Sequence, residues 1–137
     1  MLVNKVREFT EACHDNLPQT PKLIEVDRID FLRDMINSEL DEMEDAIEEE
    51  NYQSKVVGQY DAMIDILVYV ADSCVRAGYN IDPAFDCVHQ ANMRKVVDGR
   101  VLKNAADKVI KPEGWCGPEE EIKTIVTNHL RYGSWGK

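Results

Sequence analysis

The sequence predicts an all-α fold, with a four-helix bundle core, a C-terminal loop or arm and a short final helix. Apolar residues recur every three or four positions along most of the 137 residues, which is the spacing of one helix face. No run of alternating apolar and polar residues predicts a strand. The length suits one domain. We therefore expect a single domain over residues 1–137, with a core to about residue 97 and an extension over 98–137.

The first two helices follow from apolar spacing and from the residues that can begin or end a helix. The first is short, begins near Leu2 and ends before the loop "DNLPQTPK", whose two prolines interrupt helices. Asp27 or Asp30 can cap the second helix, which we expect to run to about Glu50.

The remaining helices have clearer boundaries. The third, over about residues 54–77, is the most apolar and is followed by Gly78, a residue typical of helix ends. We expect it to be central and mostly buried. Asp82 and Pro83 have the order typical of a helix start, and this fourth helix ends near "VVDGR". A loop rich in Lys, Gly and Pro follows, and a short helix over residues 118–133 ends the chain.

Composition excludes several classes of partner. The chain is 44% hydrophobic and 31% charged, and its net charge of -10 repels phosphate backbones and anionic lipids. We therefore expect no nucleic-acid partner, no membrane partner and a cytoplasmic location, since no apolar run approaches the ~20 residues that span a bilayer. An acidic protein that acts on phosphates needs a cation to offset this repulsion.

The stretch "SELDEMEDAIEEEN", residues 38–51, carries eight carboxylates without a basic residue. Because each helical residue advances by ~100°, these acids can be sorted by the side of the helix that they occupy. The apolar residues of this helix cluster in one arc that we expect to face the core: Ile29, Leu32, Ile36, Leu40, Met43 and Ile47. Asp41, Asp45 and Glu48 lie away from this arc and are predicted to be solvated.

Two acids of this helix adjoin the apolar arc and three more share a side of the next helix. Glu39 lies at the edge of the arc, and Glu42 continues the same flank. Asp61, Asp65 and Asp72 lie within roughly 40° of one another on the third helix. Asp65 stands within the apolar "AMIDILVYVA", where its carboxylate needs a partner or a proton. Facing rows of Asp and Glu suit hard divalent cations such as Mg²⁺.

Two structural alternatives need no metal. Long Glu side chains can reach water from a boundary position. Basic side chains can also pair with these acids across the helices; the candidates are Arg28, Arg33, Arg76 and Lys55.

Four segments together resemble one known family. "SELDEMEDAI" and "YDAMIDILVYV" are similar to the E-x-x-E and acidic-x-x-x-D signature of the all-α nucleoside triphosphate pyrophosphohydrolases, the MazG-like and phosphoribosyl-ATP pyrophosphohydrolase-like superfamily. "GYNIDPAFDCVHQANMRKVVDG" and "DKVIKPEGWCGPE" resemble its H-x-x-N-M-x-K segment and the K-P-x-G-W tail of its Cof-like branch. The resemblance covers roughly residues 28–118. The acidic motifs alone are common, whereas the four segments in this order are specific.

The resemblance implies an enzyme that hydrolyses the α–β phosphate bond of a (deoxy)nucleoside triphosphate to a monophosphate and pyrophosphate, in a house-cleaning role. It implies that Glu39, Glu42, Asp61 and Asp65 bind Mg²⁺ or Mn²⁺, and that Glu39 and Asp61 are catalytic, with Asp61 as a further ligand or the base for water. It also implies a homodimer or homotetramer.

The same resemblance assigns the substrate-binding residues. Asn92 and Lys95, neighbours on the fourth helix, would contact phosphates or a ligand carboxylate, and Lys111 would close over the triphosphate. For Trp115 two roles stay open: stacking on a base, or pinning the tail to the helices.

The chain departs from the family pattern at three positions. Ser38 replaces an acid that begins the first motif in many relatives, and Ala62 stands at the first acidic place of the second motif. Asp107 replaces a glycine of the tail. Two alternative functions therefore stay open: the phosphoribosyl-ATP step of histidine biosynthesis, and a catalytically silent helical bundle that binds nucleotides or proteins.

Overall fold

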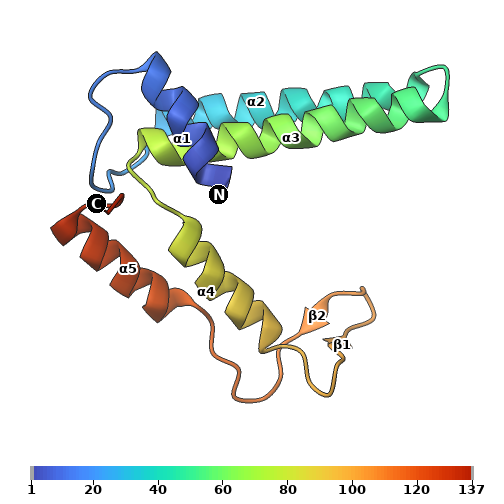
Figure 1. Cartoon of the computed structure of the whole chain (residues 1–137). Helices are drawn as coiled ribbons and strands as arrows, with labels where there is room; N and C mark the ends of the chain where they lie inside the picture. The colour runs from blue at the N-terminus through green and yellow to red at the C-terminus, as the bar shows by residue number, and fades with distance from the viewer. Residues whose placement is uncertain (1, 137) are drawn as a thin grey trace. The chain divides into compact units, whose positions relative to one another are not determined.

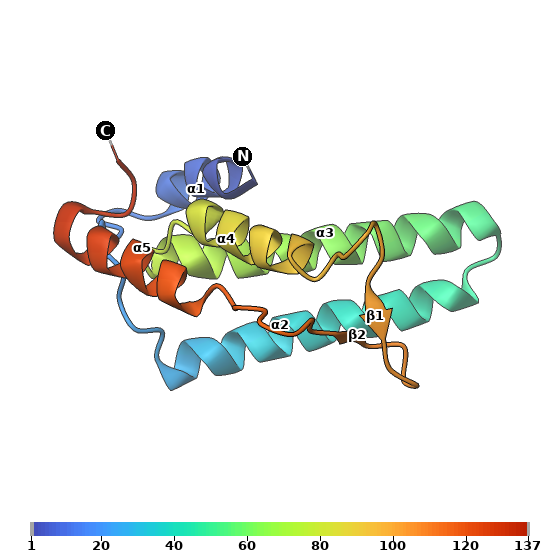
Figure 2. The same cartoon turned by 90° about the horizontal axis from the view of Figure 1, so that it is seen from below.

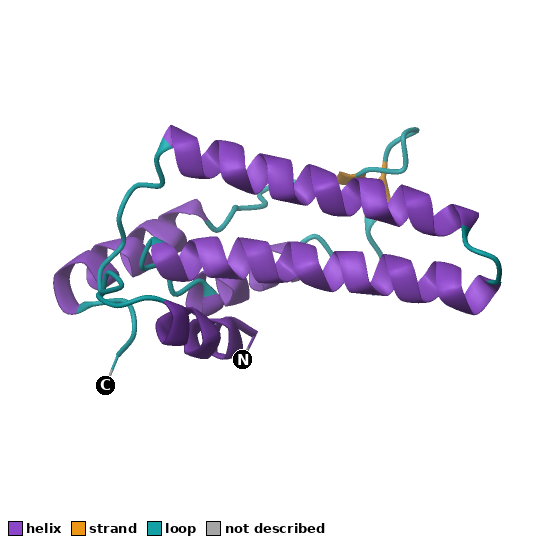
Figure 3. Cartoon of the chain, turned by 90° about the horizontal axis from the view of Figure 1, so that it is seen from above, coloured by secondary structure: helices purple, strands orange, loops and turns teal. Residues whose placement is uncertain are grey.

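The computed structural model describes residues 2–136. It is 64% helical, with five α-helices and one small two-stranded sheet, which confirms the all-α fold (Figures 1 and 3). Contacts divide the chain into two compact units, Met1–Tyr79 and Asn80–Lys137, each of which is described by itself. Within residues 2–136, no helix has both the length and the apolar character needed to cross a membrane.

The first unit is a hairpin of two long helices with a short helix against it (Figures 1 and 2). The elements are α1 (Leu2–Cys13), α2 (Val26–Asp45), the 3₁₀ turn η1 (Ala46–Glu48) and α3 (Tyr52–Arg76). Both α1 and α2 pack on α3. The predicted caps of α2 are wrong, since Glu25 is its N-cap and makes no side-chain cap bond. The side chain of Asn51 caps α3 by accepting a hydrogen bond from Ser54 N at 2.9 Å.

Two glycines permit close approaches in this unit. A Cβ on Gly58 of α3 would lie 2.7 Å from the Cβ of Ala46, so the absence of a side chain lets α3 pack directly on η1. Gly78, which follows α3, has a φ of 73° and lies against the carbonyl oxygen of Thr20. This is the left-handed conformation that favours glycine, and it confirms Gly78 as the predicted end signal.

The core of the first unit consists mainly of small side chains. Its buried apolar residues are Val3, Val6, Ala46, Ala62, Ala71, Val75 and Ala77. The expectation that α3 is mostly buried is wrong, because large side chains such as Tyr60 and Met63 are exposed. The predicted core arc of α2 is likewise only half-buried or exposed. The physical reason is that two paired helices bury the strip along which they touch and leave the rest of each apolar face uncovered.

The second unit consists of a helix pair and a small hairpin. Its elements are α4 (Asp82–Met93), β1 (Leu102–Lys103), β2 (Val109–Ile110) and α5 (Glu119–Tyr132). Helices α4 and α5 pack on each other. The sequence did not predict the antiparallel strands, since two residues each are too few to form an alternating pattern. The boundary between the units falls before α4, and the four-helix bundle stays a prediction.

Candidate functional site

Glu39 is the one buried residue of α2, and its side chain is the centre of an acidic cluster in the first unit. The residue is 7% exposed, and its Oε2 atom has no hydrogen-bond partner among residues 2–136. A buried carboxylate oxygen without a donor is costly, and such groups are normally satisfied by a proton, a donor or a cation. The helical phase predicted Glu39 at the edge of the buried face, whereas in the structure Glu39 is buried and the predicted core residues of α2 are half-buried or exposed.

Burial raises the pKa of the Glu39 carboxyl, and the neighbouring Glu42 raises it further. Glu42 can hydrogen bond to Glu39 only while one of the two carboxyls carries a proton, so this contact favours the neutral form. The charges of Asp65 and Asp61 also raise this pKa. All three other predicted ligands, Glu42, Asp61 and Asp65, therefore raise the pKa of Glu39. Asp65 is half-buried, whereas Glu42 and Asp61 are exposed.

No basic side chain neutralises this cluster within the described chain. Of the four candidates, Arg33 pairs with Asp30 at 2.7 Å, and Arg28 and Arg76 both pair with Asp72. Among residues 2–136 no ion pair joins Lys55 to Glu39, Glu42, Asp61 or Asp65. The ion-pair alternative therefore accounts for Asp72 alone.

Asp72 belongs to a polar network that joins the three helices of the first unit. Thr10 Oγ1 of α1 donates to Asp72 Oδ1 at 2.7 Å, and Arg28 Nη2 of α2 donates to Asp72 Oδ2 at 3.1 Å. Arg76 Nε donates to the same oxygen at 2.6 Å, and Arg76 Nη2 lies 2.6 Å from His14 Nε2. With two arginines and a hydroxyl around it, the Asp72 carboxylate is a structural group. The sequence grouped it with Asp61 and Asp65 because periodicity cannot distinguish a paired acid from an unpaired one.

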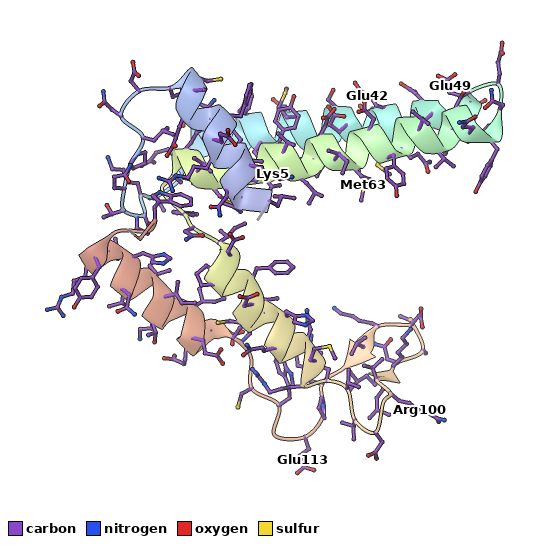
Figure 4. All side chains as sticks on the ribbon, in the orientation of Figure 1. Lys5, Glu42, Glu49, Met63, Arg100 and Glu113 are labelled. Atoms are coloured by element: carbon purple, nitrogen blue, oxygen red, sulfur yellow. The ribbon has the colours of Figure 1, made fainter. Side chains whose placement is uncertain are left out.

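The unpaired acids are chemically suited to a hard divalent cation. Carboxylate oxygens are the ligands that Mg²⁺ prefers, and the unpartnered Oε2 of Glu39 is a buried acceptor that a cation would satisfy. Among the described residues, no three His, Cys, Asp or Glu side chains are gathered closely enough to form a metal-binding group. In Figure 4, the labelled Glu42 projects outward from α2. As an exposed side chain, Glu42 is free to change rotamer.

In the second unit, the structure brings the four predicted substrate-binding residues together around one indole ring. Trp115 is half-buried, and its Nε1 donates a 2.7 Å hydrogen bond to the carbonyl oxygen of Ala91. The ammonium groups of Lys95 and Lys111 lie 5.0 and 4.9 Å from the ring centroid. Lys95 Nζ also donates to Asn92 Oδ1 at 3.0 Å. These contacts favour the pinning role of Trp115, since its polar group and its ring are both already engaged.

Arg94 is a residue of this cluster that the sequence did not single out. Its Nη2 atom donates to the carbonyl oxygen of Cys116 at 3.1 Å and lies 3.8 Å from Glu121 Oε1. Arg94 thereby holds the loop that carries Trp115 against the end of α4. In the sequence, the position of Arg94 in "NMRK" only weakly indicates this role, because exposed arginines are common on helices.

The two lysines are the cluster's free positive charges. No ion pair of the described residues joins Lys95 or Lys111 to a carboxylate. The segment from Arg94 to Lys111 has six basic and two acidic residues, in a chain whose net charge is -10. Two ammonium groups near one ring can bind an anion with several oxygens, such as a polyphosphate.

No protein-family model matches the sequence, and no curated protein matches it. The resemblance to the pyrophosphohydrolases therefore rests on the four sequence motifs alone.

Proposed function

We propose that this protein is a member of the all-α nucleoside triphosphate pyrophosphohydrolases that hydrolyses the α–β phosphate bond of a (deoxy)nucleoside triphosphate, in a house-cleaning role. The single observation that carries the proposal is the buried Oε2 of Glu39, which has no hydrogen-bond donor among residues 2–136 and lies near the charges of other acids. A group of this kind is suited to hold a cation, and the family motifs connect that cation to a nucleotide.

In this proposal Glu39, Glu42 and Asp65 hold Mg²⁺ or Mn²⁺. The cation would neutralise phosphate charge and polarise the α-phosphorus. Asp61 is exposed at the edge of the cluster and accepts the proton of the attacking water, or serves as a further ligand. Departure of pyrophosphate then completes an in-line displacement, which depends mainly on positioning and charge stabilisation.

In this proposal the cluster around Trp115, with Asn92, Lys95 and Lys111, binds the triphosphate. Lys95 and Lys111 supply two positive charges, and Asn92 fixes the Lys95 ammonium through the 3.0 Å hydrogen bond. The distribution of charge agrees with metal binding in the first unit and phosphate binding in the second. Residues 1–79 contain 18 acidic and 7 basic residues, and residues 80–137 contain 8 acidic and 9 basic residues. We propose that the enzyme acts as a cytoplasmic homodimer or homotetramer.

A substrate panel tests the proposal. The protein is incubated with each NTP and dNTP and with Mg²⁺ or Mn²⁺, and the products are separated by ion-exchange chromatography. Monophosphate and pyrophosphate are expected. Release of orthophosphate would place hydrolysis at another bond, and phosphoribosyl-ATP as the sole substrate would assign the alternative reaction. Nucleotide binding without hydrolysis in any mixture would favour the alternative of a catalytically silent helical bundle. That alternative is open because Ser38 and Ala62 depart from the family motifs.

Matched variants connect the activity to the cluster. Asp65→Asn is expected to abolish hydrolysis while far-ultraviolet circular dichroism shows unchanged helicity. Glu48→Gln, an exposed acid of the same acidic stretch, is the control and is expected to keep wild-type activity. Wild-type activity in both Asp65→Asn and Glu39→Gln would contradict the metal assignment.

A further inference from the structure

His14 is the first residue after α1, and its imidazole contacts the last residue of α3. Arg76 Nη2 lies 2.6 Å from His14 Nε2 in a partly buried contact. The backbone N–H of His14 donates to the carbonyl oxygen of Thr10 at 3.1 Å, which continues the hydrogen bonding of α1 by one residue. The contact therefore joins the end of α1 to the end of α3, which lie side by side (Figures 1 and 2).

The chemistry of the two side chains decides which of them donates in this contact. A guanidinium has five N–H donors and no acceptor, and it keeps its charge at any ordinary pH. Arg76 Nη2 is therefore the donor, and His14 Nε2 accepts, which requires that this nitrogen carry no proton. In a neutral imidazole the single N–H of His14 then lies on Nδ1. An imidazolium has N–H groups on both nitrogens and cannot accept the bond.

The charged groups that face His14 come from two helices and include more cations than anions. On α3, Arg76 contacts the ring and also donates through Nε to Asp72 Oδ2 at 2.6 Å. On α2, Arg28 Nη2 donates to the same oxygen at 3.1 Å, and Thr10 donates to the other oxygen. A protonated His14 would be a third cation beside one carboxylate that already accepts three hydrogen bonds. Repulsion from Arg76 therefore opposes protonation while the contact is made.

The acids beside His14 in the sequence do not supply a counter-charge. Glu11 accepts a 2.6 Å hydrogen bond from Arg7 within α1, and Asp15 is exposed to water. Within residues 2–136, no ion pair joins either acid to His14. A proton on His14 is therefore not offset by its own segment.

Polar contacts hold the second half of α1 on the hairpin. The buried apolar residues of α1, Val3 and Val6, lie in its first half, whereas Phe9 is 70% exposed. Beyond Phe9, the side chain of Thr10 donates to Asp72, and the ring of His14 accepts from Arg76. Loss of the His14 contact would therefore loosen the end of α1 and leave its apolar first half in place.

We propose that His14 and Arg76 form a pH-sensitive switch, which holds the end of α1 against α3 while His14 is neutral and releases it when His14 is protonated. Imidazoles in unfolded chains titrate near pH 6.5. Stabilisation by the switch is therefore present above about pH 6.5 and is lost as pH falls, because the unfolded chain binds a proton that the closed contact excludes. This inference goes beyond the proposed function, since it involves neither the proposed metal ligands nor the substrate-binding residues.

Urea denaturation of the full chain at about pH 7.5 and pH 5.5 tests the switch. Protonation of one imidazole in the unfolded state alone raises the unfolding equilibrium constant about tenfold between these values. The ratio of the wild-type constant to that of His14→Gln is therefore expected to rise about five- to tenfold on acidification. The comparison cancels the other titrating groups, and the glutamine oxygen can accept from Arg76 at either pH. His89→Gln is the control, since His89 is exposed in the other unit, and its ratio should change less than about twofold.

Two further measurements separate the switch from a merely structural contact. Arg76→Gln removes the cation and keeps His14, so it is expected to abolish the fall in stability that His14 causes on acidification. Two-bond ¹H–¹⁵N spectra of the wild type at about pH 7.5 should show His14 Nε2 unprotonated and Nδ1 protonated. The opposite tautomer would overturn the proposal. So would the same pH dependence of unfolding in the wild type and in His14→Gln.

Discussion

Asp72 of α3 accepts a 3.1 Å hydrogen bond from Arg28 of α2, and this ion pair is the centre of the network that joins α1, α2 and α3. Asp61 and Asp65 lie on the same side of α3, and no ion pair within the described part of the chain involves either of them. The three aspartates therefore have different roles, and substitution separates them.

Asp72→Asn is expected to lower the free energy of unfolding by about 2 kcal/mol, because it leaves the partly buried Arg28 and Arg76 without their counter-charge. Urea denaturation followed by circular dichroism measures this change. Asp61→Asn is the control, since Asp61 is exposed, and it is expected to change stability by less than about 0.5 kcal/mol. Equal effects of the two substitutions would contradict the structural role of Asp72.

Glu39→Gln is expected to stabilise the metal-free protein at neutral pH. Burial raises the folded-state pKa of Glu39, so stabilisation from this group is present below the unfolded pKa of about 4.3 and is lost as pH rises through the raised folded pKa. Thermal unfolding in EDTA from pH 5 to 8 should therefore show Glu39→Gln gaining on the wild type as pH rises. Glu48→Gln, which is exposed, should show no such trend.

The same pair of variants tests the cation. Mn²⁺ is expected to raise the melting temperature of the wild type and of Glu48→Gln, since a ligand that binds only the folded state stabilises it. Glu39→Gln is expected to lose most of this increase. If all three proteins respond equally to Mn²⁺, the ion binds elsewhere.

Gly58→Ala is expected to destabilise the first unit by about 1–3 kcal/mol, because the added Cβ would lie 2.7 Å from the Cβ of Ala46. A double-mutant cycle with Ala46→Gly measures the contact directly by chemical denaturation. In the double variant the new methyl group has room, so the two changes should cost less together than the sum of their separate costs. Simple additivity would show that this contact does not limit the packing of α3.

Trp115→Ala distinguishes pinning from base stacking. If Trp115 pins the loop to Ala91, the variant should bind all nucleotides and inorganic tripolyphosphate more weakly by a similar factor, about tenfold. The reason is that Lys95 and Lys111 lose the ring against which both ammonium groups lie. If the indole stacks on a base, purine nucleotides should lose more affinity than tripolyphosphate, which has no base. Isothermal titration with both ligands compares the two cases.

Local sequence signals predicted the helices well because apolar spacing and terminal residues act within a few turns. Gly78 and the Pro83 start mark their helix ends in the structure. The predicted buried face of α2 is displaced, since Glu39, expected at its edge, is the buried residue of this helix. The two-residue strands and the cap of α2 were missed, since each depends on contacts that a short pattern does not encode.

The sequence by itself therefore determined the all-α class, the approximate helix boundaries and the set of chemically notable residues. Only the tertiary structure decided which acids are neutralised: Arg28 and Arg76 both pair with Asp72, whereas one oxygen of Glu39 has no hydrogen-bond partner in the part of the chain that the structure describes. It also decided that the ammonium groups of Lys95 and Lys111 lie near the ring of Trp115, and that large side chains of α3 such as Tyr60 and Met63 are exposed. The physical reason is that helical phase gives the direction of a side chain, whereas pairing and burial depend on which other helix lies in that direction.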